Sequence, residues 1–306
     1  MLTVPPWLDT AAYPFAPHTF DTGAGQLHYL DEHAPEGRTG PPIVFVHGTP
    51  TWSFEWRHLV KDLRGEYRCL ALNHLGFGLS DKPVGADFRP EAHARRFTEW
   101  VRHLGLTDIT LVVHDFGGPI ALAYALQHPE NVRAIVVLNS WLWNPRDDTH
   151  FIGAAKLLAN PVGRFLYERL NVSARAILPA AYGDKRKLTP AIHRQYLAPF
   201  ARPTDRASTF ALLRSLLDSG DWFGGLWEQR EILKTKPLLF LWGDRDPTFG
   251  IPTLTRWRKA FSEAETHVLP GAGHWPHEEE PEQVSALLRA FLAQTASLGR
   301  DADRIS

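Results

Sequence analysis

The sequence predicts an α/β protein in which a mostly parallel central sheet is flanked by helices and carries an inserted helical cap. Two observations predict this class. Short apolar runs typical of strands alternate with helical patterns through the first half of the chain and return near its end. Between residues 141 and 229, apolar side chains instead recur at helical spacing without a convincing strand. We therefore expect a core formed by residues 1–140 and 230–306, interrupted by a helical cap at 141–229.

Seven short apolar runs are expected to form the strands, because they are rich in β-branched and aliphatic residues. In chain order, these runs are 26–30, 43–46, 68–72, 110–113, 134–138, 237–242 and 265–269. Helices are expected at 91–104, between Pro90 and Gly105, and at 120–128, where Pro129 ends the pattern. An amphipathic helix at 283–293 is expected to close the fold.

Composition and charge narrow the class of function. With 306 residues, of which 44% are hydrophobic and 22% charged, the chain is long enough for one deep core with an inserted subdomain. The net charge is −1 and the basic residues are dispersed, so we expect neither a nucleic-acid partner nor an anionic membrane partner. No apolar run approaches the roughly 20 residues that a membrane span needs. The single cysteine, Cys69, is expected to be a buried thiol, which favours a reducing, cytoplasmic location.

The most informative motif runs from Leu111 to Pro119, where an apolar strand pattern meets a sharp turn and a helical pattern follows. This is the pattern of a nucleophile elbow, a strained strand-to-helix corner that exposes one side chain. The exposed residue is Asp115 rather than the usual serine. A carboxylate attacks carbon by displacing a leaving group and becomes an ester, whereas Ser and Cys are suited to acyl transfer. We expect Asp115 to be a nucleophile; a lone aspartate in a turn would otherwise form the turn or cap the helix.

Two later strand ends offer partners for this aspartate, because ligands bind at the carboxyl ends of parallel strands. The sixth predicted strand runs into a loop with Asp244 and Asp246, and the seventh runs into a glycine loop that presents His274. The order nucleophile, acid, histidine is that of the α/β-hydrolase catalytic triad. Asp246 is preferred as the acid because of its spacing from Gly243, while Asp244 suits a turn or a solvated loop.

The fourth motif of the predicted active site is the turn from His47 to Pro50, directly after the second predicted strand. In this fold, the backbone N–H after such a His-Gly pair and the N–H after the nucleophile form the oxyanion hole, which assigns the amides of Thr49 and Phe116. We expect His114, beside the nucleophile, to brace the elbow. His277 is expected at the surface.

With these motifs, the chain resembles the haloalkane dehalogenases from Tyr29 to the final helix. The segments that carry the resemblance are HGTPTWSFEWR at 47–57, GFGLSDKP at 76–83, the Asp115 elbow, GDRDPTF at 243–249 and GHWPH at 273–277. The resemblance implies an α/β-hydrolase fold that converts small apolar haloalkanes and water to alcohol and halide through an ester on Asp115. It also supports Asp246 as the acid, because Asn139 stands where related enzymes with the alternative arrangement carry Glu.

Two positions depart from the family's pattern. Haloalkane dehalogenases typically place Trp just after the nucleophile, and many place Asn after the His-Gly turn, to hold the departing halide; here these residues are Phe116 and Thr49. Phenylalanine has no donor, and losing one preorganised donor costs about 3–4 kcal/mol. We therefore expect slow dehalogenation unless another indole replaces the missing donor. The candidates for the substrate and halide pocket are Trp52, Trp141, Trp143 and Trp222.

Two other functions fit the same motifs. Epoxide hydrolases share the elbow, the His-Gly-x-Pro turn and the histidine, and their paired cap tyrosines would correspond to two of Tyr167, Tyr182 and Tyr196. A non-catalytic small-ligand-binding protein on the same scaffold is the alternative of another class, although the intact triad argues against it. No metal or organic cofactor is expected, because the histidines lack a convincing ligand cluster and the loop at 76–78 does not follow the dinucleotide-binding pattern.

Overall fold

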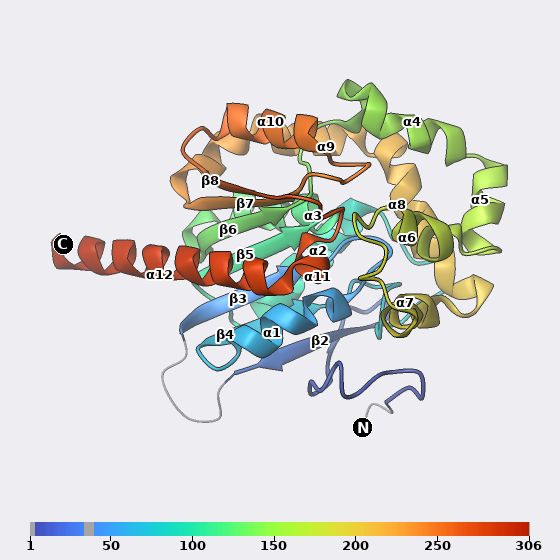
Figure 1. The fold of residues 1–306 in the computed structure, drawn as a ribbon, viewed down its shortest axis with the longest axis horizontal. Helices are drawn as coiled ribbons and strands as arrows, with labels where there is room; N and C mark the ends of the chain where they lie inside the picture. Colours follow the sequence, from blue (N-terminus) through green and yellow to red (C-terminus); the bar gives the residue numbers. More distant parts are fainter. Residues whose placement is uncertain (1–3, 34–39, 306) are drawn as a thin grey trace.

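The computed structural model describes residues 4–33 and 40–305, which contain one eight-stranded sheet with helices on both faces (Figure 1). The strand order is β1-β2-β4-β3-β5-β6-β7-β8. β1 and β2, and β2 and β4, pair antiparallel, and all other neighbours pair parallel. The strands are β1 (His18–Asp21), β2 (Gln26–Glu32), β3 (Gly40–Val46), β4 (Tyr67–Leu72), β5 (Ile109–His114), β6 (Val132–Leu138), β7 (Leu238–Gly243) and β8 (Glu265–Leu269). The predicted fold class is confirmed.

All seven predicted strands are present, with small shifts at their ends. The strand that the sequence analysis missed is β1, which lies at the edge of the sheet beside β2. Its four residues alternate between half-buried and exposed, and only Phe20 among them is apolar. A short polar edge strand has no hydrophobic pattern to reveal it, because only one of its faces and one of its edges are covered.

Two hydrophobic clusters, one on each face, hold the sheet between its helices. Alternate residues of β3 show the arrangement: Val44 and Val46 pack with α2 and α3, while Ile43 and Phe45 pack with α1 and α12. The core helices are α1 (Arg57–Leu63), α2 (Pro90–His103), α3 (Gly117–Gln127), α10 (Ile251–Ala260), α11 (Pro276–Glu279) and α12 (Pro281–Ile305). Burial on both faces explains why the parallel strands read as continuous apolar runs.

The segment between β6 and β7 is helical, and within it the structure shows no strand. Its α-helices are α4 (Thr149–Leu158), α5 (Pro161–Glu168), α6 (Leu178–Ala180), α7 (Pro190–Leu197), α8 (Ala207–Asp218) and α9 (Gly220–Glu228). In Figure 1 these helices gather beside one end of the sheet. Residues from α4, α5 and α8 line a cavity together with Asp115, so this layer covers the carboxyl ends of the strands.

The three predicted helices are also present. α2 and α3 match the predicted ranges closely, while α12 extends from Pro281 to Ile305, well beyond the predicted 283–293. Within the described ranges, no helix is both long and apolar enough to cross a membrane. Cys69 is a free, buried thiol in β4, as predicted.

Candidate active site

Asp115 lies at the corner between β5 and α3. Its φ angle is 51°, in the left-handed region that residues other than glycine rarely adopt. The Ser140 hydroxyl donates to the Asp115 carbonyl oxygen at 2.6 Å. A Cβ atom at Gly48 would overlap the Asp115 carboxylate, and one at Gly117 would overlap the backbone of Val46. Close packing therefore holds this strained corner in place, as a nucleophile elbow requires.

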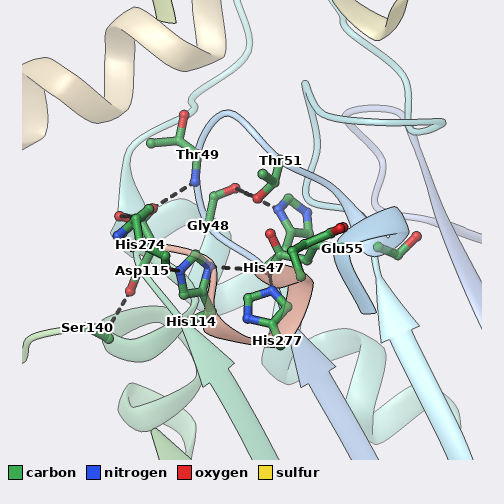
Figure 2. Close-up of polar contacts among 12 residues, drawn as sticks. His47, Gly48, Thr49, Thr51, Glu55, His114, Asp115, Ser140, His274 and His277 are labelled. Atoms are coloured by element: carbon green, nitrogen blue, oxygen red, sulfur yellow. Dashed lines mark hydrogen bonds and ion pairs between the residues drawn. The ribbon is translucent and has the colours of Figure 1, made fainter. Parts of the chain in front are cut away.

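The two oxygens of the Asp115 carboxylate have different partners. The backbone N–H of Thr49 donates to Oδ1 at 2.8 Å, while Oδ2 lies 3.6 Å from Nε2 of His274 (Figure 2). The Thr49 amide therefore already contacts one oxygen, and the other faces the histidine.

His274 is oriented by Asp246, the acid that the sequence analysis preferred. Nδ1 of His274 donates to Oδ2 of Asp246 at 2.7 Å, and the Asn139 side-chain amide donates to the same oxygen at 2.8 Å. The backbone N–H of Thr248 donates to Oδ1 at 2.7 Å. Asp244 instead accepts from the Gly271 amide in an exposed turn.

Charge and hydrogen bonding set the protonation of this pair. Burial disfavours a charged Asp246, but the charge and hydrogen bond of His274 and the backbone donors of Thr248 and Phe249 together lower its pKa. Burial likewise disfavours a charged His274, but Asp246 and Asp115 outweigh it and raise the pKa of His274 to about 10. The substrate-free site therefore holds a protonated histidine between two carboxylates at neutral pH.

A cavity of about 140 Å³ opens above the Asp115 carboxylate. Its walls are mainly apolar, and Asp115 and His274 are among its polar lining residues. The lining residues are Thr49, Pro50, Asp115, Phe116, Ala155, Leu158, Tyr167, Ser173, Ile177, Ala181, Thr209, Leu213, Leu216, Thr248, Phe249, His274 and Trp275. A cavity of about 150 Å³ accommodates a molecule the size of benzene, so this site suits a small apolar ligand.

The four tryptophans proposed for the pocket are not among the lining residues, and this prediction is corrected. Trp52 donates its indole N–H to the Gln195 carbonyl at 2.9 Å. Trp141 packs edge-on behind Phe116, stacked on Phe249. Trp143 packs among other core aromatic rings, and Trp222 borders a separate surface hollow beside α2. Large indoles fill space in the core, and their count in the sequence does not reveal which of them reaches a cavity.

Trp275 and Tyr167 line the cavity, although the sequence analysis did not single out either for the halide pocket. Trp275 directly follows His274, and its ring packs edge-on against the His274 ring, with centroids 4.5 Å apart. Its position beside the triad histidine was the available signal. Tyr167 comes from α5, and its placement depends on how the cap folds over the sheet.

The three cap tyrosines do not form the pair that an epoxide hydrolase uses. Tyr167 lines the cavity, but the Tyr196 hydroxyl donates to Glu278 outside it. Tyr182 stacks on the far side of Trp275, with ring centroids 5.3 Å apart, and is not a lining residue. This geometry removes the observation on which the epoxide-hydrolase alternative depended.

A second polar group lies behind the elbow, away from the cavity (Figure 2). It consists of Glu55, His114 and His277, all three fully buried. The expectation that His277 lies at the surface is wrong, because α11 turns it inward to stack on Trp56. Among the described residues, these three offer possible metal-ligand atoms that all lie within 4.8 Å of one another.

Comparison with known proteins agrees with this geometry. A family model described as alpha/beta hydrolase fold matches residues 41–281. The chain is 33% identical over 284 residues to Haloalkane dehalogenase 2 of Mycobacterium tuberculosis, covering 92% of this chain and 96% of the relative. It is also 31% identical over 301 residues to a cis-3-alkyl-4-alkyloxetan-2-one decarboxylase of Shewanella oneidensis, covering 95% of this chain and 92% of the relative.

Among solved structures, the haloalkane dehalogenase DatA from Agrobacterium tumefaciens C58 superimposes with a TM-score of 0.81 at 28% identity, covering 92% of this chain and 97% of that chain. The chain therefore belongs to the α/β-hydrolase fold family, and within that family it is a haloalkane dehalogenase-like hydrolase.

Proposed function

We propose that the protein hydrolyses small haloalkanes to alcohol and halide through an alkyl ester on Asp115. The observation that carries this proposal is that the two oxygens of the Asp115 carboxylate have different partners. The Thr49 amide donates to Oδ1, and Oδ2 faces His274, which Asp246 orients. Acyl-transfer chemistry uses a hydroxyl or thiol at this position, whereas a carboxylate is suited to displacement at carbon.

In the first step, Oδ2 attacks the carbon that bears the halogen from the side opposite the halogen. The new C–O bond forms as the C–halogen bond breaks, and both electrons of that bond leave with the halide. The apolar cavity holds the two centres in line and excludes bulk water, which raises the effective concentration of the reactants.

The developing halide needs donors, because Phe116 supplies none from its side chain. We propose that Tyr167, Trp275 and the Thr49 hydroxyl share this role. Trp275 Nε1 and Thr49 Oγ1 are buried, and neither makes a hydrogen bond with the described residues. Burial and the nearby Asp115 charge both raise the pKa of Tyr167, so its phenol keeps its proton and remains a donor.

Alkylation also prepares His274 for the second step. It removes the negative charge of Asp115, one of the two charges that raise the His274 pKa, so the histidine releases its proton to solvent. Neutral His274 then takes a proton from water, and the resulting hydroxide adds to Cγ of the ester. The negative charge develops on Oδ1, which the Thr49 amide already contacts, with the Phe116 amide as the proposed second donor.

Collapse of this intermediate breaks the bond between Cγ and the alkyl-bearing Oδ2. The alcohol leaves with that oxygen and takes its proton from His274, while the oxygen from water completes the new carboxylate and its remaining proton passes to His274. Asp246 stabilises the positively charged histidine throughout. The sum is haloalkane plus water giving alcohol, halide and one proton.

Halide release from brominated alkanes tests the proposal directly. We expect release by the purified protein, and none above background in an Asp115→Asn variant whose circular dichroism matches the parent. Equal halide release by the two proteins would contradict it.

A second candidate is ring opening and decarboxylation of a β-lactone, the activity named for relatives from Shewanella oneidensis and Xanthomonas campestris. Phe116, which has no side-chain donor, suits this reaction, because the leaving carboxylate stays attached to the substrate and needs no separate halide site. Oδ2 would attack the ring carbon that bears the ester oxygen, and loss of CO2 would then release an alkene and restore Asp115. The small cavity favours the haloalkane over a dialkyl lactone. Formation of CO2 and alkene without halide chemistry would distinguish the two.

We further propose that residues 141–229 act as a substrate-binding cap on a core formed by 1–140 and 230–306. The free, buried thiol of Cys69 supports a reducing, cytoplasmic location. A non-catalytic binding role is disfavoured because His274, Asp246 and Asp115 retain a complete set of contacts.

A further inference from the structure

The buried group behind the elbow has no part in the reaction steps above, yet it touches the catalytic histidine. Glu55 lies in a short 3-10 helix (Ser53–Trp56), His114 ends β5, and His277 lies in α11, three residues after His274. The rings of His114 and His274 have centroids 4.6 Å apart. Elements that are far apart in the sequence therefore place one carboxyl group and two imidazoles directly behind His274 (Figure 2).

One hydrogen bond fixes the orientation of this group. Nε2 of His114 lies 2.7 Å from the backbone carbonyl oxygen of His274. A carbonyl oxygen only accepts, so Nε2 of His114 carries a proton and donates it. In a neutral ring, the lone pair is then on Nδ1, which faces Oε1 of Glu55 at 3.4 Å.

Oε1 of Glu55 and Nδ1 of His114 would then be two acceptors facing each other in a buried site, which is unfavourable unless a proton lies between them. His277 does not supply it through an added charge, because burial lowers its pKa well below the ordinary value. Burial also raises the pKa of Glu55, although His114 opposes the shift. One proton between Oε1 of Glu55 and Nδ1 of His114 satisfies both atoms and links the two side chains.

We propose that Glu55 is a positioning residue: its carboxyl group, acting through His114, holds the backbone of His274 and so fixes the imidazole between Asp246 and Asp115. The proposal rests on the catalytic role proposed for His274. Nε2 of His277 lies 3.7 Å from the same Oε1 of Glu55, so the second imidazole closes the group on its other side.

The surrounding charges are consistent with a neutral network. Arg57 and Glu278 pair with each other beside it, with Nη2 and Oε2 2.9 Å apart, and Trp56 covers His277 by stacking at 4.3 Å between ring centroids. His47, which faces His114 from the end of β3, is also buried and has its pKa lowered. One proton shared by Glu55 and His114, beside a neutral His277, adds no net charge to this interior.

A divalent cation in the same place fits less well. One carboxylate would leave a net positive charge in a fully buried pocket, beside a histidine that must itself become positive. The described residues offer three ligand residues there, whereas a structural zinc site usually has four.

The test compares Glu55→Leu, which removes the partner of His114, with Glu55→Gln, whose amide can still donate to His114. We expect Glu55→Leu to lower kcat about tenfold, with KM within about twofold of the parent, because a misplaced base slows the chemical steps more than binding. Glu55→Gln should recover most of that loss. Val132→Ala, a buried change at the first residue of β6, controls for a general loss of stability.

A second readout does not need turnover. The ring resonances of His274 in substrate-free protein, assigned by their loss in His274→Ala, should shift and broaden in Glu55→Leu and stay near the parent positions in Glu55→Gln. If no haloalkane is turned over but these resonances behave as expected, the proposed function fails and the positioning role stands. Parent-like kcat and His274 resonances in Glu55→Leu would overturn it, as would one bound metal ion per chain by elemental analysis.

Discussion

The two walls of the catalytic cavity are built differently. The wall formed by the core presents Asp115, His274 and the Thr49 amide from the ends of strands, and the polar atoms of its carboxylates are paired within that wall. The wall formed by the cap presents mostly aliphatic side chains, with Tyr167 as a polar group close to Asp115. In the proposed mechanism, bond breaking therefore belongs to the core, while the cap is expected to limit the size of the ligand and to help stabilise the leaving group.

The largest effect should come from the core wall. Asp246→Asn removes the charge that stabilises a positive His274 and replaces one carboxylate oxygen with a donor that meets the Asn139 amide. We expect kcat for halide-forming turnover to fall about 10³- to 10⁴-fold. Steady-state kinetics with 1-bromobutane checks this, and Asp244→Asn in the adjacent exposed turn is the matched control. Similar losses in both variants would contradict the assignment of the acid.

A smaller effect is expected from Tyr167, a polar cap residue that lines the cavity with Asp115. Tyr167→Phe removes the phenol donor and keeps the ring, so the rate of halide release should fall about a hundredfold. Tyr182→Phe, also in the cap but outside the cavity, should stay near the parent rate. Stopped-flow halide measurements compare the two. If Tyr167→Phe releases halide at the parent rate, the leaving group is stabilised by the core wall alone.

The aliphatic cap wall should change selectivity more than rate. Leu216→Ala enlarges the cavity from α8, so the ratio of kcat/KM for a longer bromoalkane over bromoethane should rise about tenfold. Leu126→Ala, a buried core change in α3, controls for loss of stability. An unchanged ratio in Leu216→Ala would show that the cap wall does not determine ligand size.

His274 in the core wall should also make the free energy of unfolding depend on pH. His274 has a folded-state pKa of about 10, above its ordinary value of about 6.5, so its charged form stabilises the folded protein. That contribution is complete below about pH 6.5 and is lost as the pH rises toward 10. Urea unfolding between pH 6.5 and 10 should therefore show a declining free energy of unfolding, and the decline should be smaller in His274→Ala. The same pH dependence in both proteins would contradict the raised pKa.

The same contrast explains what the sequence could predict. Asp115, His274 and the preferred Asp246 follow apolar strands in short local motifs, and fold geometry brings such strand ends together. The cavity wall has no comparable local signal: Tyr167 reaches it only through cap packing. Trp52 and Trp143 were plausible donors by residue type, but their rings are used inside the core. His277 was misplaced because α11 is only four residues long and has no hydrophobic period to show its inward face.

The central claim is a covalent ester on Asp115, and one measurement tests it most directly. His274→Ala lacks the base for hydrolysis, so incubation with 1-bromobutane should leave a butyl group on the protein. Peptide mass spectrometry should then find this group on Asp115, in an amount matching the bromide released. Bromide release without an alkyl group on Asp115, or an alkyl group on another residue, would contradict the account.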